Sequence, residues 1–462
     1  MSTDERINIT TGNLWLSIWQ LSWPMLLIMI FNFLVGLTDV YVAGFISPEV
    51  QAVVGFVSQI FFLNIIIANA ISIGTIALLA RSIGAGDFAG AVKIARQSLI
   101  FGIVAALVLM MAGLAFYREI VAIAGFPENI RSIAERFIRI FALSLGPNYI
   151  LIISNAVFRA SGEVKKVLVT MFLVSAVNIT GNFVLVFGVP PFPKMGDAGI
   201  ALSTALAVTA GMIINFILFF FSRWRAIYRT PAEVSVNIIK KIVSLSWPAA
   251  LLQIAWNAGS IILYNILGRL GSTSITALAA LTNGLRIEAI IYLPAYALNM
   301  AAAVLVGQNL GAKKVVRAEE VGWKMALSGI AFISVMAIII FIRAEVFASI
   351  VTGNPSVLKE TVRYLRFNMV SEPFMALSSI LAGGLQGAGD TRGTMRIIII
   401  AMWVIRLPLA YMLALGLSYG APGVWTAMVI SMVIQSILMA HRFRHGLWRG
   451  TTLEQFENHR EP

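Results

Sequence analysis

Long apolar stretches recur along the whole of this 462-residue chain and constrain its fold more than any other feature. A helix of about 20 apolar residues crosses the roughly 30 Å hydrocarbon layer of a bilayer. Charged residues make up 12% of the chain, whereas about a quarter of the residues in a soluble domain are charged. The sequence therefore predicts an all-α integral membrane protein.

Turn signals rich in glycine, proline and acidic residues separate these stretches and predict twelve membrane spans. The predicted spans cover residues 14–43, 52–80, 94–117, 137–158, 166–189, 198–222, 240–268, 274–308, 319–342, 360–385, 394–416 and 421–441. If both termini are cytosolic, cytosolic segments hold 22 of the 34 Lys and Arg residues and external loops hold 10. This bias predicts a multi-pass protein of the plasma (inner) membrane with both termini in the cytosol.

The two halves of the chain repeat each other. "LSWPMLLIMIFN" at 21–32 returns as "LSWPAALLQIAWN" at 245–257, an offset of 224, and "ASGE" at 160–163 matches "GAGD" at 387–390, an offset of 227. Six spans per copy is an even number, so both copies start on the same side, as in the parallel repeats of many secondary transporters. We expect two six-helix lobes related by a pseudo-two-fold axis. Their predicted limits are 1–225 and 240–441, with a cytosolic linker at 226–239 and a cytosolic tail at 442–462.

The sequence lacks residues and motifs that several kinds of enzymatic and metal-binding chemistry require. The chain has no cysteine, and its three histidines, His441, His445 and His459, all lie near the C-terminus. The dipeptide Gly-Lys of a phosphate-binding loop does not occur. We therefore expect no enzymatic activity and no cofactor, with energy from an ion gradient or a separate subunit. The net charge of +13 reflects the membrane topology, so we expect no nucleic-acid partner, and the basic tail "HRFRHGLWRGTTLEQF" is predicted to touch anionic lipid.

Asp39, in "FLVGLTDVYVAGF", is the only charged residue that lies well inside a span of the first half, away from the span ends. A charge near the membrane centre costs about 2.5–3.5 kcal/mol on insertion scales, so it must be paired or hydrated. The residue at the equivalent repeat position is Leu263, so the repeated fold itself does not require an acid there. Two interpretations compete: a hydrogen-bonded buried acid, or a functional acid that binds a proton or a cation.

Polar side chains in spans 5 and 6 are candidate partners of this acid. Asn178 and Asn182, in "NITGN", lie four residues apart and so share one helix face, and Thr204 adds a hydroxyl from "GIALSTAL". One carboxylate with amide and hydroxyl oxygens suits a hard monovalent cation such as Na⁺. Asn and Thr also join helices in membranes without binding any ion, and the sequence leaves both roles open.

The second half carries four charged residues well inside its spans, which sum to zero: Arg286, Glu288, Glu372 and Arg406. Residues two apart on a helix point to different sides, so Arg286 does not pair with Glu288 and needs a partner such as Glu372 or a residue of span 11. One interpretation is a neutral charge network, especially for the arginines, that fixes helix packing. The other is that Glu288 or Glu372 is a second proton or cation site.

Acidic residues also close three cytosolic turns. Asp87, Glu163 and Asp390 each stand at the start of a predicted helix, where an acid accepts hydrogen bonds from the first turn. We expect a structural role for all three.

Taken together, these motifs resemble the multidrug and toxic compound extrusion family over essentially the whole chain. The resemblance is carried by "LSWPMLLIMIFNFLVGLTDVYVAG", "RSIGAGD", "GLRIEAIIYLPAYALNMAAAVLVGQNLGA", "SEPFMAL…GGLQGAGDTRG" and "RLPLAY". It implies two lobes forming a V and a central cavity with alternating access. It also implies export of small organic, often cationic, compounds in exchange for H⁺ or Na⁺.

The resemblance places Asp39 at an acidic position of the family, with Asn178 and Thr204 at polar positions that line a cation site in some members. Those members carry a second aspartate where this chain has Asn182, which favours H⁺ over Na⁺. We expect an antiporter, acting as a monomer, in which Asp39 is the coupling acid. The main alternative is a flippase for lipid-linked precursors, which typically needs a more basic cavity than two span arginines provide.

Overall fold

The computed structural model of the protein describes residues 9–229 and 233–449, which form helices and turns with no strand among them. The first half contains six long helices that match the first six predicted spans. They are α1 (Leu14–Ile46), α2 (Pro48–Gly84), α3 (Phe88–Ala115), α5 (Glu128–Ala160), α6 (Val164–Phe187) and α7 (Asp197–Phe220).

Six further long helical segments form the second half. They are α9 (Val236–Gly268), α10 (Ser274–Gly311), α11 (Val315–Ile342), α13 (Pro355–Gly387), the continuous run from α14 to η4 (Thr391–Gly416) and α16 (Ala421–His445). The all-α class is confirmed, and each of the twelve predicted spans corresponds to a long helical segment of the described chain.

Eleven of these helices are long and apolar enough to span a membrane, and α13 is the one that is not. It packs against α10, α11 and α16, and most of its residues from Ser371 to Gly387 are buried. A helix enclosed by protein on several sides needs little apolar surface toward lipid, and this explains how α13 tolerates Glu372 and several serines.

The internal repeat is visible in the helix limits. Adding 227 to the limits of α3 (Phe88–Ala115) gives those of α11 (Val315–Ile342), and the same shift converts α5 (Glu128–Ala160) into α13 (Pro355–Gly387). The parallel repeat inferred from the short motifs therefore extends over whole helices.

The described chain divides into two compact units. The first unit holds residues 23–246, and the second holds residues 9–22 together with residues 247–449. The two divisions fall at the same repeat position, after Ser22 and after Ser246 in the two copies of "LSWP" (246 − 22 = 224).

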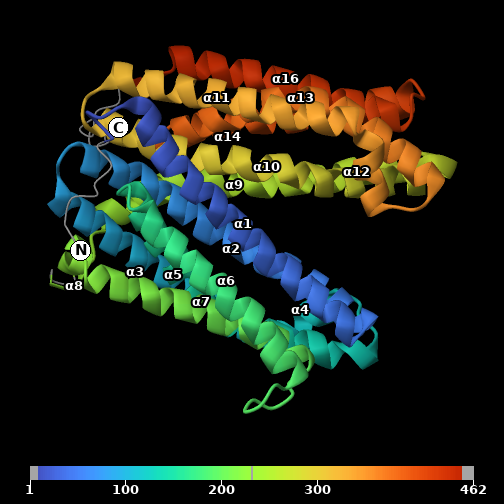
Figure 1. The fold of residues 1–462 in the computed structure, drawn as a ribbon, viewed down its shortest axis with the longest axis horizontal. Coiled ribbons are helices and arrows are strands. Elements are labelled where there is room, and N and C mark those ends of the chain that lie inside the picture. The colour runs from blue at the N-terminus through green and yellow to red at the C-terminus, as the bar shows by residue number, and fades with distance from the viewer. Residues whose placement is uncertain (1–8, 230–232, 450–462) are drawn as a thin grey trace. The chain divides into compact units, whose positions relative to one another are not determined.

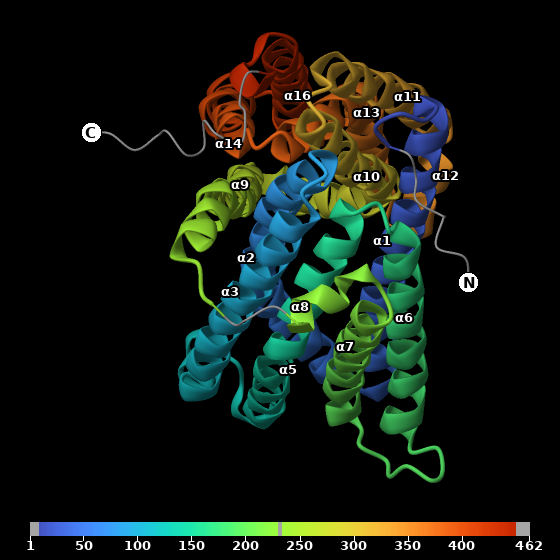
Figure 2. The same ribbon diagram turned by 90° about the vertical axis from the view of Figure 1, so that its left-hand side faces the viewer.

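Equivalent helices occupy the centre of each unit. In the first unit α5 packs against α2, α3 and α7, and α6 lies along α7 (Figure 2). In the second unit α13 has the corresponding place, beside α10, α11 and α16 (Figure 1).

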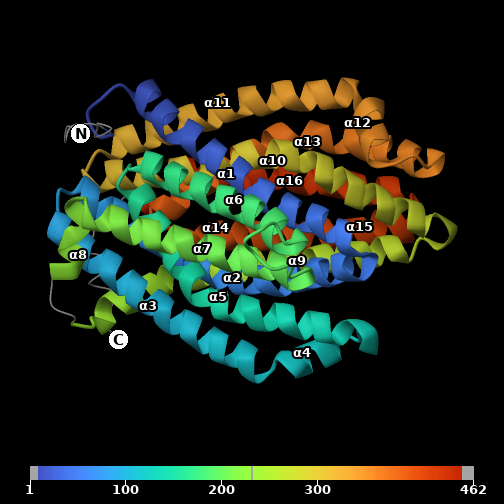
Figure 3. The ribbon, with the colours of Figure 1, turned by 60° about the horizontal axis from the view of Figure 1, so that its bottom comes forward.

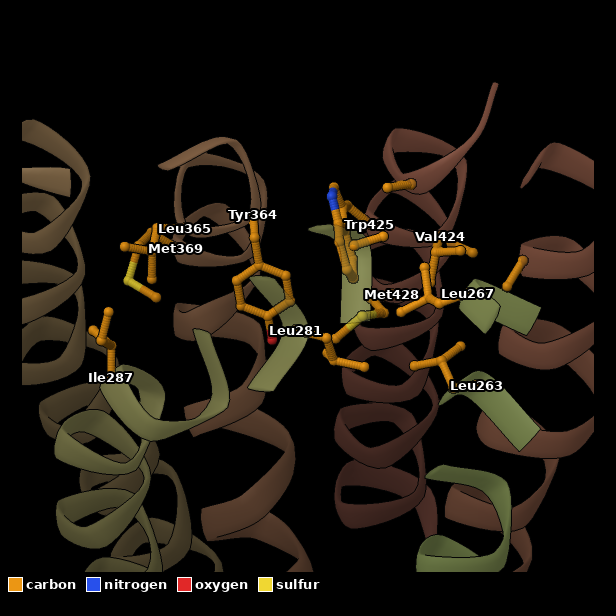
Figure 4. Packing of buried hydrophobic residues seen from close by; sticks show 14 of the residues in the cluster. Leu263, Leu267, Leu281, Ile287, Tyr364, Leu365, Met369, Val424, Trp425 and Met428 are labelled. Carbon is orange, nitrogen blue, oxygen red and sulfur yellow. The ribbon is translucent and has the colours of Figure 1, made fainter. Parts of the chain in front are cut away.

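A hydrophobic core gathers around the tyrosine and tryptophan side chains of the second unit. Tyr364 of α13 and Trp425 of α16 are fully buried and meet edge to face, with ring centroids 4.7 Å apart. Figure 4 shows Leu365 and Met369 on one side of Tyr364, and Val424 and Met428 beyond it. Aromatic pairs of this geometry contribute about 0.5–1.5 kcal/mol beyond the burial of their area.

Two short helices were not predicted from the sequence. α4 (Tyr117–Ile123) follows α3, and α12 (Ala344–Val351) follows α11 at the corresponding point of the repeat (Figure 3). Each is too short to cross a membrane, and each begins next to an arginine, Arg118 or Arg343, that interrupts the preceding apolar run.

The span that contains Pro408 is irregular. It begins as α14 (Thr391–Ile399), widens to a π-helix over Ile400–Arg406 (η3), returns to α-helix over Leu407–Tyr411 (α15) and widens again over Met412–Gly416 (η4). Pro408 has no amide hydrogen to donate, so the regular pattern of hydrogen bonds cannot run through it. The wide turn ends at Arg406, and wide turns of this kind are frequent at functional sites.

The start of the C-terminal tail is partly buried in the protein, whereas the sequence predicted a surface segment in contact with lipid. Trp448 is 2% exposed, its indole nitrogen donates to the carbonyl oxygen of Phe443 over 2.8 Å, and its ring stacks on that of Phe443. This packing was not predicted, because the basic residues around Trp448 in the sequence indicated a surface segment. The rest of the predicted tail, from residue 450, and His459 lie outside the described residues.

Close packing of α10 on α13 depends on two glycines one turn apart. A Cβ on Gly387 would lie 1.9 Å from the carbonyl oxygen of Ala303, and one on Gly383 would lie 2.1 Å from that of Asn299. We expect Gly387→Ala to destabilise the protein by about 1–3 kcal/mol because the helices must move apart. Thermal unfolding in detergent measures this loss.

Gly55→Ala in α2 is the matched control, since nothing lies within 4 Å of the added atom. It should be neutral or stabilising by up to about 1 kcal/mol. Equal losses from the two substitutions would contradict the packing explanation.

Candidate functional site

Asp39 lies in α1 and faces polar side chains of α6 and α7 within the first unit. The amide nitrogen of Asn182 donates to Asp39 Oδ1 over 2.6 Å, and that of Asn178 donates to the same oxygen over 3.2 Å. The hydroxyl of Thr204 donates to Asp39 Oδ2 over 3.1 Å. The structure therefore brings Asp39 together with all three side chains that the sequence singled out as its candidate partners.

Local sequence explains why these groups converge. Asn178 and Asn182 are four residues apart on α6, and both are fully buried. Gly181 between them allows α7 to approach, since a Cβ there would lie 2.9 Å from that of Ser203. The hydroxyl of Ser203 donates to Asn182 Oδ1, which orients that amide toward Asp39. Ser203 belongs to the site and was missed, because a serine beside Thr204 is not distinctive in an apolar helix.

The charge of the Asp39 carboxylate is offset by neutral donors alone. Among residues 9–229 and 233–449 it forms no ion pair within 4.0 Å. Asp39 itself is half-buried, whereas Thr204 is 8% exposed and the two amides are enclosed. Such an acid can accept a proton or hold a small cation without first breaking an ion pair.

A second buried polar cluster in the same unit was not predicted. The amide nitrogen of Asn215 in α7 donates to Ser154 Oγ over 2.7 Å and to Asn155 Oδ1 over 2.9 Å, and Thr170 donates to Asn215 Oδ1 over 2.8 Å. Thr170 and Asn215 each stand alone among apolar neighbours, and Ser154 and Asn155 are a single polar pair in an apolar stretch of α5. This cluster joins α5, α6 and α7 and so stiffens the unit that carries Asp39.

In the second unit three of the four charged span residues lie close together. Glu288 of α10 interacts electrostatically with Arg406 and with Glu372 of α13. Tyr364, which the sequence analysis did not single out, lies among them and interacts with all three. The guanidinium of Arg406 donates to Ser431 Oγ over 2.8 Å and lies 5.1 Å from the ring centre of Trp256.

This cluster holds two acids and one cation, and part of its hydrogen-bonding capacity is unused. Glu372 and Arg406 are 6% and 5% exposed. Within the described chain, Glu288 Oε1 and the Tyr364 hydroxyl are buried and interact with each other, and neither has another hydrogen-bond partner. Two acids beside one cation suit the uptake of one proton or monovalent cation.

Arg286 differs from the network expected for it. It is exposed and, among the residues described, has no acidic partner within 4.0 Å. The reason is geometric: Glu288 points into the unit, so a residue two positions earlier on the helix points away. Both arginines had been expected in a network with the acids, and Arg406 is the one that lies beside them.

The acids of the three turns expected to be cytosolic make local contacts. Asp87 Oδ1 accepts from the amide of Gly90 over 2.8 Å, and Asp390 Oδ1 accepts from that of Gly393 over 3.1 Å. Asp390 also pairs with Arg442, and Glu163 accepts from the indole of Trp224 over 3.1 Å. Asp87 and Asp390 thus cap α3 and α14 as expected. The expectation was wrong for Glu163, whose side chain caps no helix and instead pairs with Lys166 and Arg223.

Known proteins resemble the chain over nearly its full length. "Uncharacterized transporter YisQ" of Bacillus subtilis is 22% identical over 435 residues, which cover 94% of each chain. "Probable multidrug resistance protein NorM" of Thermotoga maritima is 25% identical over 426 residues, covering 91% of this chain and 90% of that protein.

Solved structures share the fold. A crystal structure of MATE in the bent conformation has a TM-score of 0.87 at 21% identity and covers 96% of this chain and 97% of its own. An outward-facing multidrug resistance transporter of the MATE family has the same TM-score and identity and covers 98% of this chain.

The MatE family model matches the chain twice, over residues 24–184 and 248–412. The two matches begin at Pro24 and Pro248, at equivalent positions of the internal repeat (248 − 24 = 224). Family, relatives and fold agree, and the chain belongs to the MatE family of multidrug efflux transporters.

Proposed function

We propose that the protein is a secondary-active antiporter that exports organic, often cationic, compounds in exchange for H⁺ or Na⁺ by alternating access. The single observation that carries this proposal is the Asp39 site, a membrane-embedded carboxylate held by three neutral donors. We propose no catalytic activity and no cofactor besides the coupling ion. We further propose a monomer with both termini in the cytosol and lobes at 1–225 and 240–441, joined by the linker 226–239 and followed by the tail 442–462.

Asp39 is proposed to alternate between two occupancies. When it is ionised, the amide nitrogens of Asn178 and Asn182 and the hydroxyl of Thr204 offset its charge. When it is protonated, the carboxyl group becomes a donor, and its strongest partners must reorient. A change of one charge at such a site shifts a two-state equilibrium by a few kcal/mol, enough to reverse which state is populated.

The same four side chains suit Na⁺ if their amides turn. Each amide can present its oxygen in place of its nitrogen, and together with Asp39 and Thr204 this makes a set of oxygen ligands. A single carboxylate and two amides form a less anionic site than a pair of carboxylates, so we propose H⁺ as the coupling ion in preference to Na⁺.

Reconstituted vesicles test the proposal. Uptake of a fluorescent organic cation into proteoliposomes is measured with a pH gradient alone and then with a Na⁺ gradient alone. We expect the pH gradient to drive transport and the Na⁺ gradient to drive little. Equal transport without any gradient would refute antiport altogether, and transport driven by Na⁺ alone would assign the other ion.

Asn182→Asp is expected to change the coupling ion. The amide nitrogen at 182 lies 2.6 Å from Asp39 Oδ1, so a carboxylate there places two acids in direct contact. Two such acids repel unless a proton or a cation lies between them. We expect Na⁺-driven transport to rise at least tenfold, as followed in the same vesicles.

Ser203→Ala serves as its control, because it removes the hydroxyl that orients Asn182 and adds no charge. An Asn182→Asp variant whose transport responds to Na⁺ no more than Ser203→Ala would contradict the proposed ligand set.

The Glu288 and Glu372 cluster is proposed as a second ion site. Its two buried acids beside a single cation, Arg406, support this role. Both acids belong to the second unit, so a proton taken up there acts on the packing of α10 against α13.

A further inference from the structure

Arg286 occupies an unusual position for a charged residue in a membrane helix. It lies twelve residues after Ser274, the first residue of α10, which is about 18 Å along the helix axis. Its side chain is exposed, and no described residue pairs with it. This places it well inside the predicted span 274–308.

The residues one turn earlier on the same face are polar. Asn283 precedes Arg286 by three positions and Thr282 by four, so all three share one side of α10. Thr282 lies 3.3 Å from the hydroxyl of Tyr264 in α9. The amide of Asn283, partly exposed, has no hydrogen-bond partner in the part of the chain that the structure describes.

The opposite side of α10 explains why Arg286 remains unpaired. There Glu288 faces Arg406, which serves as the cation of the buried cluster. Among the described residues, no acid of its own unit therefore neutralises the positive charge of Arg286. Unpaired charged groups within membrane spans face water, since lipid cannot solvate them.

We propose that Arg286, with Asn283, binds a carboxylate or similar oxygen-bearing anionic group of the transported compound. This rests on the proposed transport function and refines its substrate class: zwitterions with a carboxylate are carried in addition to simple cations. A guanidinium presents parallel N–H groups that match a carboxylate, and the neighbouring amide adds a further donor. Thr282 and Tyr264 continue the same polar strip toward the start of α10.

The first test asks whether this face of α10 meets water. The chain contains no cysteine, so single cysteines can be introduced without a background. We expect Asn283→Cys to react with a charged thiol reagent in vesicles. Ile338→Cys, on a 57% exposed apolar position of α11, should react poorly because it faces lipid. Equal, slow reaction at both positions would overturn the proposal.

The second test compares two probes that differ only in one anionic group. A rhodamine dye with a free carboxyl is zwitterionic, and its methyl ester is a cation of nearly the same shape. A charge-assisted hydrogen bond contributes about 1.5–3 kcal/mol, which corresponds to roughly 10- to 100-fold. For Arg286→Gln we expect the ratio of kcat/KM for the acid to that for the ester to fall by this factor, with Arg286→Lys in between.

Arg269→Gln, an exposed arginine just after α9, is the matched control and should leave the ratio unchanged. A ratio that Arg286→Gln does not alter would refute the substrate assignment. If the wild-type protein transports neither dye, the antiport proposal fails on its own. Equilibrium binding of the same two dyes to wild type and Arg286→Gln then decides the role of Arg286 separately.

Discussion

Asp39→Asn is expected to abolish gradient-driven efflux, with a loss of at least a hundredfold, while insertion and folding stay near normal. An asparagine has nearly the shape of the protonated acid, so it fits between α6 and α7. It cannot gain or lose a proton, and it offers no charge to a cation. The variant should therefore be held in one occupancy, and transport in vesicles with an imposed pH gradient measures the loss.

Thr38→Ala is the control for this substitution. The Thr38 hydroxyl donates to the carbonyl oxygen of Leu34 within its own helix over 2.8 Å and takes no part in the Asp39 site. It should transport like the wild type. Full gradient-driven transport by Asp39→Asn would remove Asp39 from the mechanism, and loss of folded protein in detergent would make its role structural instead.

Arg406→Gln is expected to destabilise the second unit by about 3–5 kcal/mol, because it leaves two buried acids without a cation. Arg406 is 5% exposed, and its neighbours include Glu288, the hydroxyl of Ser431 and the ring of Trp256. Thermal unfolding in detergent gives the loss. Arg363→Gln removes only the exposed ion pair with Glu360 and should cost less than about 1 kcal/mol.

A double substitution separates charge from packing. If electrostatics cause the loss, Glu372→Gln in the Arg406→Gln background should restore about 0.5–3 kcal/mol, since one uncompensated acid is removed. Additive losses from the two substitutions would show that packing, not charge, dominates at Arg406.

The sequence was sufficient for the architecture because its signals are long. Each span repeats an apolar composition over more than twenty residues, and twelve long helices result. Most of them are longer than predicted, and α5 begins at Glu128 where its span was predicted from residue 137. Short structural features were not predicted from the sequence. The helices α4 and α12 have fewer than ten residues each, and the π-helical turns around Pro408 leave no trace in hydropathy.

The Asp39 site was predictable because its members are rare in their surroundings. A lone acid in span 1 and two asparagines one turn apart in span 5 stand out from an apolar background. Ser203 and Asn215 do not stand out, since single polar residues also join helices. Their role depends on which helices pack together.

The partners of the charged span residues in the second half could not be predicted from the sequence, because they depend on how the helices are rotated and packed. Spacing showed that Arg286 and Glu288 point to different sides, but it did not show which of them turns inward. The structure turns Glu288 toward Tyr364 and Arg406 and leaves Arg286 exposed. The packing of Gly284 against the Tyr364 ring, where a Cβ would lie 2.1 Å away, fixes this rotation of α10.

The most direct test of the account is ion release on substrate binding. Purified protein in weakly buffered detergent receives the rhodamine methyl ester, and a pH indicator follows the solution. If occupancy of Asp39 and binding of the organic cation exclude each other, the wild-type protein releases protons and Asp39→Asn releases none. Equal proton release by both proteins would contradict the claim that Asp39 couples the ion to the transported compound.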